Sequence, residues 1–103
     1  GFDAHRDDPI GAMEVSGEGF RAMTALVRAL AEDVCQGRLA FVLEGGYVDS
    51  GLREGTGSVL DALVDPEPHL PPLESLTAGS PLERVVRGVV DIHGTNIPEL
   101  GAP

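Results

Sequence analysis

The sequence predicts an α/β fold in which helices cover a mostly parallel sheet. Three observations support it: an amphipathic helical pattern at 16–37, a short continuous apolar run at 39–43, and a second helical pattern at about 49–63. A helix, a buried strand and a helix in this order are typical of proteins that pack helices on a parallel sheet. A length of 103 residues fits one small domain.

Residues 1–37 predict a loop followed by a helix. The stretch 1–11 has neither a helical nor a strand period, so we expect a loop that leaves a truncated strand. Ser16 can cap the helix, with Glu18 in its first turn, and Gly37 is expected to end it. The apolar stripe recurs at spacings of three and four: Phe20, Met23, Leu26, Val27, Leu30 and Val34.

The run 39–43 is too short for a helix and lacks the alternation of a half-exposed strand. It therefore predicts a strand that is buried on both faces of a sheet. The helix expected at about 49–63 has Leu52, Val59, Leu60 and Leu63 as its apolar stripe. Three glycines within it weaken the helical pattern, because each costs about 1 kcal/mol relative to Ala.

The C-terminal third begins with four prolines at 65–72, which predict an extended connector over 65–79. Ser80, Pro81 and Glu83 then supply an N-cap, a first-turn proline and a capping-box acid. A helix with a tail is thus expected over 80–103. Its apolar stripe follows helical spacing: Leu82, Val85, Val86, Val89 and Val90.

Composition excludes several classes of function. Seventeen acidic and seven basic residues give a net charge of -10, and every basic residue is a scattered Arg, which disfavours nucleic-acid binding. No apolar run is long enough to cross a membrane, and the single Cys35 excludes an internal disulfide, so we expect a cytoplasmic protein. The opening Gly1, without a start residue, indicates a piece of something longer.

Asp3-Ala4-His5 has a spacing that puts two possible metal ligands on one side of an extended chain. Asp3 would stand at the end of the truncated strand, where α/β proteins bind ligands. Two ligands do not make a site, and the competing interpretation is a capped loop with a solvated His5.

Glu44-Gly45-Gly46-Tyr47 directly follows the predicted strand. Gly45 and Gly46 allow a sharp turn close to a bound molecule, and they leave Tyr47 over the strand edge. Its hydroxyl could donate a hydrogen bond to charge developing on a substrate oxygen. The competing interpretation is a tyrosine that packs its ring on a neighbour.

Taken together these segments resemble a known family. The stretch 1–9 (GFDAHRDDP), Gly19-Phe20 and 42–47 (VLEGGY) are similar, in order and spacing, to the C-terminal third of histone deacetylases. The closest likeness is to bacterial deacetylase-like and class II members, a group that includes acetylpolyamine amidohydrolases and acetoin-utilisation proteins. The resemblance covers residues 1–64, which would be the C-terminal portion of a deacetylase domain.

The resemblance implies a C-terminal part of a three-layer arginase/deacetylase-like fold, with Asp3 as a ligand of a catalytic Zn²⁺ and Tyr47 as the group that stabilises the tetrahedral intermediate. It implies no metal role for His5. The family's histidine pair and its other two zinc ligands are missing, since His69 and His93 lie in the wrong context. We therefore expect the 103 residues alone to be inactive.

The function implied is hydrolysis of an acetylated amine, such as acetyl-lysine or an acetylpolyamine, by a full-length protein. One alternative is a non-catalytic remnant or partner-binding module of the same fold. Another is an arginase-like ureohydrolase, which would need acidic clusters for two manganese ions. The Glu44–Tyr47 turn favours the deacetylases.

Overall fold

A computed structural model describes residues 1–67, 69–70 and 78–98 of the chain. It contains three helices: α1 (Gly17–Cys35), α2 (Asp49–Val64) and α3 (Pro81–His93). The chain divides into two compact units, Gly1–Pro71 with α1 and α2, and Pro72–Pro103 with α3. Most of the predicted connector 65–79 and the end of the predicted tail lie outside the described residues.

The prediction of an α/β fold with a mostly parallel sheet is wrong for the part of the chain that the structure describes. The only strand-like pairing there is an isolated parallel bridge between His5 and Val15. The run 39–43 is extended but unpaired, and Phe41, Val42 and Leu43 are 52%, 78% and 65% exposed. A strand forms only when a neighbouring strand completes its backbone hydrogen bonds, and none is present in these ranges.

The starts of α1 and α3 follow the capping signals in the sequence, whereas α2 begins after Val48 without a side-chain cap. The Ser16 hydroxyl accepts a hydrogen bond from the Gly19 N–H (3.2 Å) at the start of α1. Gln36 takes the left-handed conformation after its last turn (φ 59°), one residue before the predicted stop at Gly37. The Ser80 hydroxyl caps α3 by accepting from the Glu83 N–H (3.1 Å).

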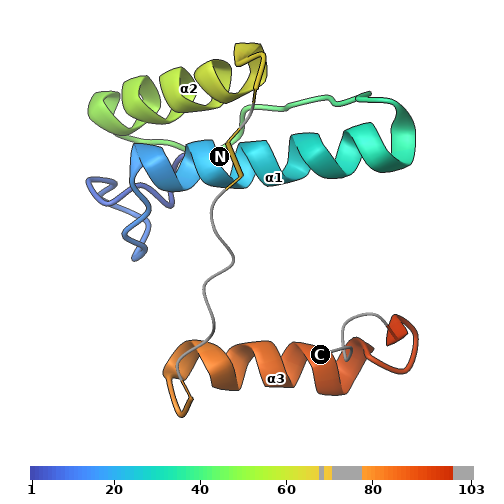
Figure 1. Cartoon of the computed structure of the whole chain (residues 1–103). Helices are drawn as coiled ribbons and strands as arrows, with labels where there is room; N and C mark the ends of the chain where they lie inside the picture. The colour runs from blue at the N-terminus through green and yellow to red at the C-terminus, as the bar shows by residue number, and fades with distance from the viewer. Residues whose placement is uncertain (68, 71–77, 99–103) are drawn as a thin grey trace. The chain divides into compact units, whose positions relative to one another are not determined.

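The first unit is a pair of packed helices that run in the same direction, with the extended segment returning between their ends (Figure 1). Its core is small: among the described residues, the buried apolar side chains are Phe20, Ala25, Ala31 and Ala62. Arg28, within α1, joins this helix to the C-terminal end of α2 by donating to the carbonyls of Ala62 (3.0 Å) and Asp65 (2.6 Å). Loop 1–15 packs against this pair of helices.

In the second unit the described residues form one amphipathic helix, α3, and no residue of this helix is buried. Its predicted apolar stripe forms one face of the helix, and Arg87 pairs with Glu83 (2.9 Å) one turn earlier. Among the described residues, no helix combines the length and the apolar character needed to cross a bilayer.

Candidate functional site

The Asp3 segment lies directly against the turn that contains Tyr47. The Phe2 N–H donates a hydrogen bond to the Gly45 carbonyl (2.7 Å). A Cβ atom at position 45 would lie 2.6 Å from the Asp3 Cγ, so glycine at this position lets the Asp3 side chain lie directly against the turn. Gly46, at φ 134°, carries the turn on to Tyr47. The structure thus brings together Asp3, Gly45, Gly46 and Tyr47, and we call this contact the junction.

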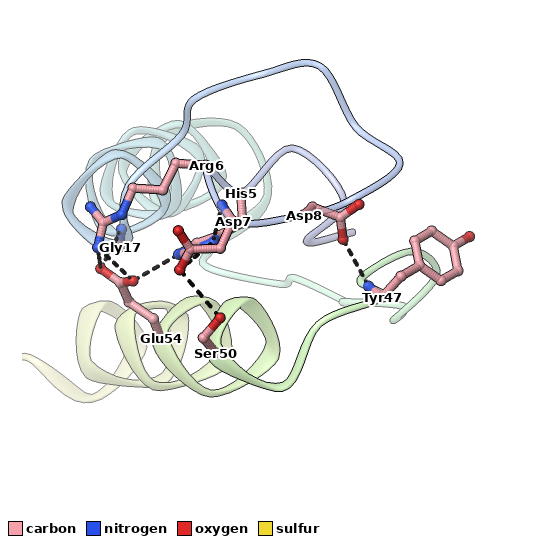
Figure 2. Close-up of polar contacts among 8 residues, drawn as sticks. All are labelled: His5, Arg6, Asp7, Asp8, Gly17, Tyr47, Ser50 and Glu54. Atoms are coloured by element: carbon pink, nitrogen blue, oxygen red, sulfur yellow. Dashed lines mark hydrogen bonds and ion pairs between the residues drawn. The ribbon is translucent and has the colours of Figure 1, made fainter.

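Both side chains that the sequence singled out at the junction are accessible. Asp3 is exposed, and 59% of Tyr47 is exposed. Figure 2 shows the Tyr47 ring pointing away from the hydrogen-bonded side chains and ending in a free-standing hydroxyl. A phenol in this position is available to a bound molecule.

Asp8 fixes the backbone on the Tyr47 side of the junction. One carboxylate oxygen accepts from the N–H groups of Ile10 (2.9 Å) and Gly11 (3.0 Å), and the other accepts from the Tyr47 N–H (2.8 Å). Burial favours a higher pKa for Asp8, but the Gly11, Tyr47 and Ile10 N–H groups outweigh it and hold the pKa below its usual value. Asp8 is therefore a carboxylate near neutral pH.

His5 is fully buried and both of its ring nitrogens are occupied. Nε2 lies 2.7 Å from the Glu54 carboxylate, and Nδ1 accepts a hydrogen bond from the Asp7 N–H (3.1 Å). The bond to Nδ1 assigns the ring proton to Nε2, which donates to Glu54. The ring also stacks on Phe20 (centroids 6.4 Å apart). His5 has no nitrogen left for a metal ion, and its part here is structural.

Glu54 is the common partner of several polar groups from loop 1–15 and α1, as Figure 2 shows. Besides His5 its carboxylate accepts from the Gly17 N–H (3.1 Å) at the start of α1 and from Arg6 (3.0 Å). The hydrogen bond from His5, followed by that from Gly17, lowers the pKa of Glu54 against the effect of burial. A carboxylate at a helix N-terminus is also favoured by the helix dipole. We call His5, Arg6, Gly17 and Glu54 the polar cluster.

The sequence did not point to Glu54, and it pointed to Asp8 only as part of a loop. Glu54 pairs with His5 across 49 residues, and Asp8 reaches Tyr47 across 39. No local spacing encodes such contacts. The available signal was the pair Gly51 and Gly55, one helical turn apart, which flank Glu54 and let His5 and Phe2 approach α2 closely.

The residues present do not fit a complete catalytic zinc site. Such a site uses three protein ligands, and the described residues contain no group of three His, Cys, Asp or Glu side chains that could hold a metal ion. Asp3 is accessible as one ligand, while His5 is committed to Glu54 and Asp7. What the junction offers by itself is an exposed carboxylate, Asp3, against the turn that carries the exposed side chain of Tyr47.

Comparisons with known proteins converge on one group. Residues 1–63 match the model of the histone deacetylase domain. A histone deacetylase-like amidohydrolase of Pseudomonas aeruginosa is 50% identical over 50 residues, which are 48% of this chain and 13% of that protein. A probable deacetylase of Archaeoglobus fulgidus is 34% identical over 101 residues, covering 89% of this chain and 28% of that protein.

A third relative, type-2 histone deacetylase 2 of Dictyostelium discoideum, is 37% identical over 76 residues, or 68% of this chain and 4% of that protein. The chain thus spans between 4% and 28% of the length of these three relatives. No solved structure matches the chain. The matched region includes α1, all of α2 except its last residue, and every residue of the junction.

Proposed function

The chain belongs to the histone deacetylase family, and we propose that it supplies part of the active site of an enzyme that hydrolyses acetylated amines, such as acetyl-lysine or an acetylpolyamine. The observation that carries this proposal is the junction. The exposed Asp3 lies against the turn that carries the exposed Tyr47, and the bonds from Phe2 to Gly45 and from Tyr47 to Asp8 hold these two distant segments together. A scaffold without chemistry would have no need to expose both.

Tyr47 is the catalytic residue in this proposal. Hydrolysis of an amide passes through a tetrahedral intermediate whose oxygen carries negative charge, and a fixed hydrogen-bond donor at that oxygen lowers the barrier. The Tyr47 side chain is exposed and its backbone N–H is held by the Asp8 carboxylate, and both observations support this role. Gly45 and Gly46 leave the backbone of the turn open to close approach by the acetyl group.

Asp3 is proposed as one ligand of a catalytic Zn²⁺. A carboxylate oxygen is a normal zinc ligand, and Asp3 is exposed where the junction opens. The other ligands, and the group that transfers protons, are not among the described residues. The described residues accordingly account for the positioning of the carbonyl oxygen and for one metal ligand, and not for proton transfer.

The experiment compares the longest natural product of the gene with its Asp3→Ala variant. Bound metal is measured by elemental analysis, and acetate release is measured with an acetyl-lysine peptide and with an acetylpolyamine. We expect stoichiometric zinc and turnover of one of the two substrates, and loss of metal and turnover together in Asp3→Ala. Asp33→Ala, which removes an exposed carboxylate from α1, is the matched control and should keep both.

Two outcomes would reject the proposal. A natural product that binds no zinc and releases no acetate would indicate the non-catalytic remnant or partner-binding module. An Asp3→Ala variant that keeps full zinc content would remove Asp3 from the metal site, even if the enzyme were active.

A further inference from the structure

One oxygen of Asp8 makes a contact that its local turn does not require. An aspartate commonly closes a turn by accepting from the N–H groups two and three residues later, as Oδ1 does with Ile10 and Gly11. Oδ2 instead accepts from the Tyr47 N–H at 2.8 Å, across 39 residues. Asp8 is only 7% exposed, so water competes weakly for this bond.

The turn that Asp8 closes packs tightly against the backbone of Asp3. A Cβ atom at position 11 would lie 1.7 Å from the Asp3 carbonyl oxygen, which shows how closely Gly11 approaches it. The Asp8 carboxylate therefore holds, through Gly11, the segment that contains Asp3, and holds Tyr47 directly. Together with the bond from the Phe2 N–H to the Gly45 carbonyl, it joins the segment that contains Asp3 to the turn that contains Tyr47.

The link acts on the backbone of Tyr47 and leaves its side chain alone. Figure 2 shows the Asp8 carboxylate bonded to the Tyr47 nitrogen, while the ring projects to the opposite side. Tyr47 follows Gly46, a residue with a left-handed φ of 134° and no side chain to restrain the turn. Without the bond from Asp8, little in the turn itself would fix the position of the Tyr47 backbone, from which the side chain extends.

We propose that Asp8 is a positioning residue that fixes the Tyr47 hydroxyl relative to Asp3 without contacting the substrate. This inference rests on the proposed function of Tyr47. The hydrogen bond from Tyr47 forms fully only as negative charge develops on the substrate oxygen, and it contributes little to binding of the substrate itself. Displacement of Tyr47 therefore lowers kcat and leaves KM nearly unchanged. A displacement of about 1 Å at a reacting group can cost on the order of 100-fold in rate.

The test uses Asp8→Asn in the full-length protein. Asparagine keeps the shape and one acceptor oxygen for the Ile10 and Gly11 N–H groups, but its NH₂ group then faces the Tyr47 N–H, donor against donor. We expect kcat for an acetyl-lysine peptide to fall about 10- to 100-fold with KM within about twofold. Bound zinc should not change. Asp7→Asn is the matched control, since Asp7 is the adjacent carboxylate and its side chain contacts Ser50 rather than Tyr47.

A double-mutant cycle separates this inference from the proposed function. If Asp8 acts through Tyr47, Asp8→Asn should have little further effect on kcat in a Tyr47→Phe background. Hydrogen exchange of the peptide that contains Tyr47 gives a readout independent of activity, and it should be faster in Asp8→Asn than in Asp7→Asn. A normal kcat in Tyr47→Phe would reject the proposed function of Tyr47. A full Asp8→Asn effect in that background would reject only the positioning role.

A folding failure is also informative. Asp8→Ser retains a hydroxyl that can accept from the local turn but is too short to reach Tyr47, and it should reproduce the kcat loss if Asp8→Asn does not fold. If both variants lose their thermal unfolding transition, Asp8 serves the fold as a whole and the positioning role is rejected.

Discussion

Two regions of the Gly1–Pro71 unit differ in how completely their side chains find interaction partners within the chain. Around the junction and the polar cluster, no buried side-chain nitrogen or oxygen of the described residues lacks a hydrogen-bond partner. Between α1, α2 and the extended segment lies a hollow of about 440 Å³, the apolar hollow, lined largely by exposed or half-exposed apolar side chains. The lining includes Phe2, Phe20, Met23, Val27, Phe41, Val42, Leu43, Val59, Leu60 and Leu63.

The difference shows which interactions a short stretch of chain can complete. A hydrogen bond needs one partner at the right distance, and loop 1–15 finds its partners on α1, α2 and the Tyr47 turn. Burial of an apolar surface needs a second surface of similar area, and a strand needs a neighbour along its whole length. The buried polar groups find their hydrogen-bond partners within the described residues, whereas the apolar side chains of the hollow remain largely exposed.

The largest effect that we expect concerns the chemistry of the junction. In the full-length protein, Tyr47→Phe should lower kcat about 100- to 1000-fold, or roughly 2.7 to 4 kcal/mol, because one donor to the intermediate is lost. The bond from the Tyr47 N–H to Asp8 is a backbone bond and survives the change. Steady-state assays with an acetyl-lysine peptide, together with the zinc content, check this. A Tyr47→Phe enzyme with normal kcat would reduce the junction to a structural contact.

The next effect concerns the packing of the core between the two regions. Gly55→Ala should destabilise the chain by about 1 to 3 kcal/mol, the usual effect of overfilling a packed site. The added methyl would lie 2.2 Å from the Phe2 ring, and Phe2 cannot move without disturbing its edge-to-face contact with Phe20 (centroids 5.1 Å apart). Unfolding in urea, followed by circular dichroism, measures this change.

Gly57 provides the matched control for that substitution. It lies in the same helix, and a Cβ atom there would meet nothing within 4 Å. Gly57→Ala should therefore stabilise the chain by about 0.8 to 1 kcal/mol through the helix propensity of alanine. Equal destabilisation by both substitutions would show that the helix, and not the approach of Phe2, is what they disturb.

The sequence predicted local structure well because the signals for local structure are local. Ser16 and Ser80 cap the helices as expected, and α2 ends one residue from its predicted end. It failed on the sheet because an apolar run shows only that a segment is suited to burial. Leu39 to Leu43 has the composition of a buried strand, but the strands that would flank it are absent from the described residues.

For the candidate site, the sequence identified the exposed residues and missed what holds them. Asp3 and Tyr47 follow recognisable segments of chain, so resemblance to a family could point to them. The functions proposed for them remain predictions. Glu54 lies in the middle of a helix and looks like any solvated acid, and its partners His5 and Gly17 are distant in sequence. Contacts of this kind become visible only when the fold is known.

The stability that Glu54 gives to the polar cluster should depend on pH. Its pKa is lowered in the folded chain from an ordinary value of 4.5, so the folded state favours the carboxylate. This contribution is complete above that ordinary value and is lost as the pH falls through the lowered, folded value. Melting temperatures should therefore fall on acidification, and less steeply in Glu54→Gln. Asp8, whose pKa is also lowered, should preserve part of the slope. An identical slope in Glu54→Gln would contradict the assignment.

The smallest effect on folding, and the most direct test of the apolar region, comes from Val42. Its side chain is 78% exposed in an extended segment whose backbone has no strand partner in the described ranges, and such edges associate. The 103-residue chain should therefore sediment as larger species when concentrated. Val42→Lys should return it to a monomer, because a charged edge residue resists strand pairing, while the free energy of unfolding changes by less than about 0.5 kcal/mol.

Val64→Lys is the control for this substitution. Val64 is 76% exposed at the end of α2, outside the extended segment, and its replacement by Lys makes the same change in charge. If both lysines suppressed association equally, net charge would explain the result. If the unmodified chain stayed monomeric at every concentration, the exposed apolar side chains would need no partner surface. The proposed difference between the apolar hollow and the junction would then be rejected.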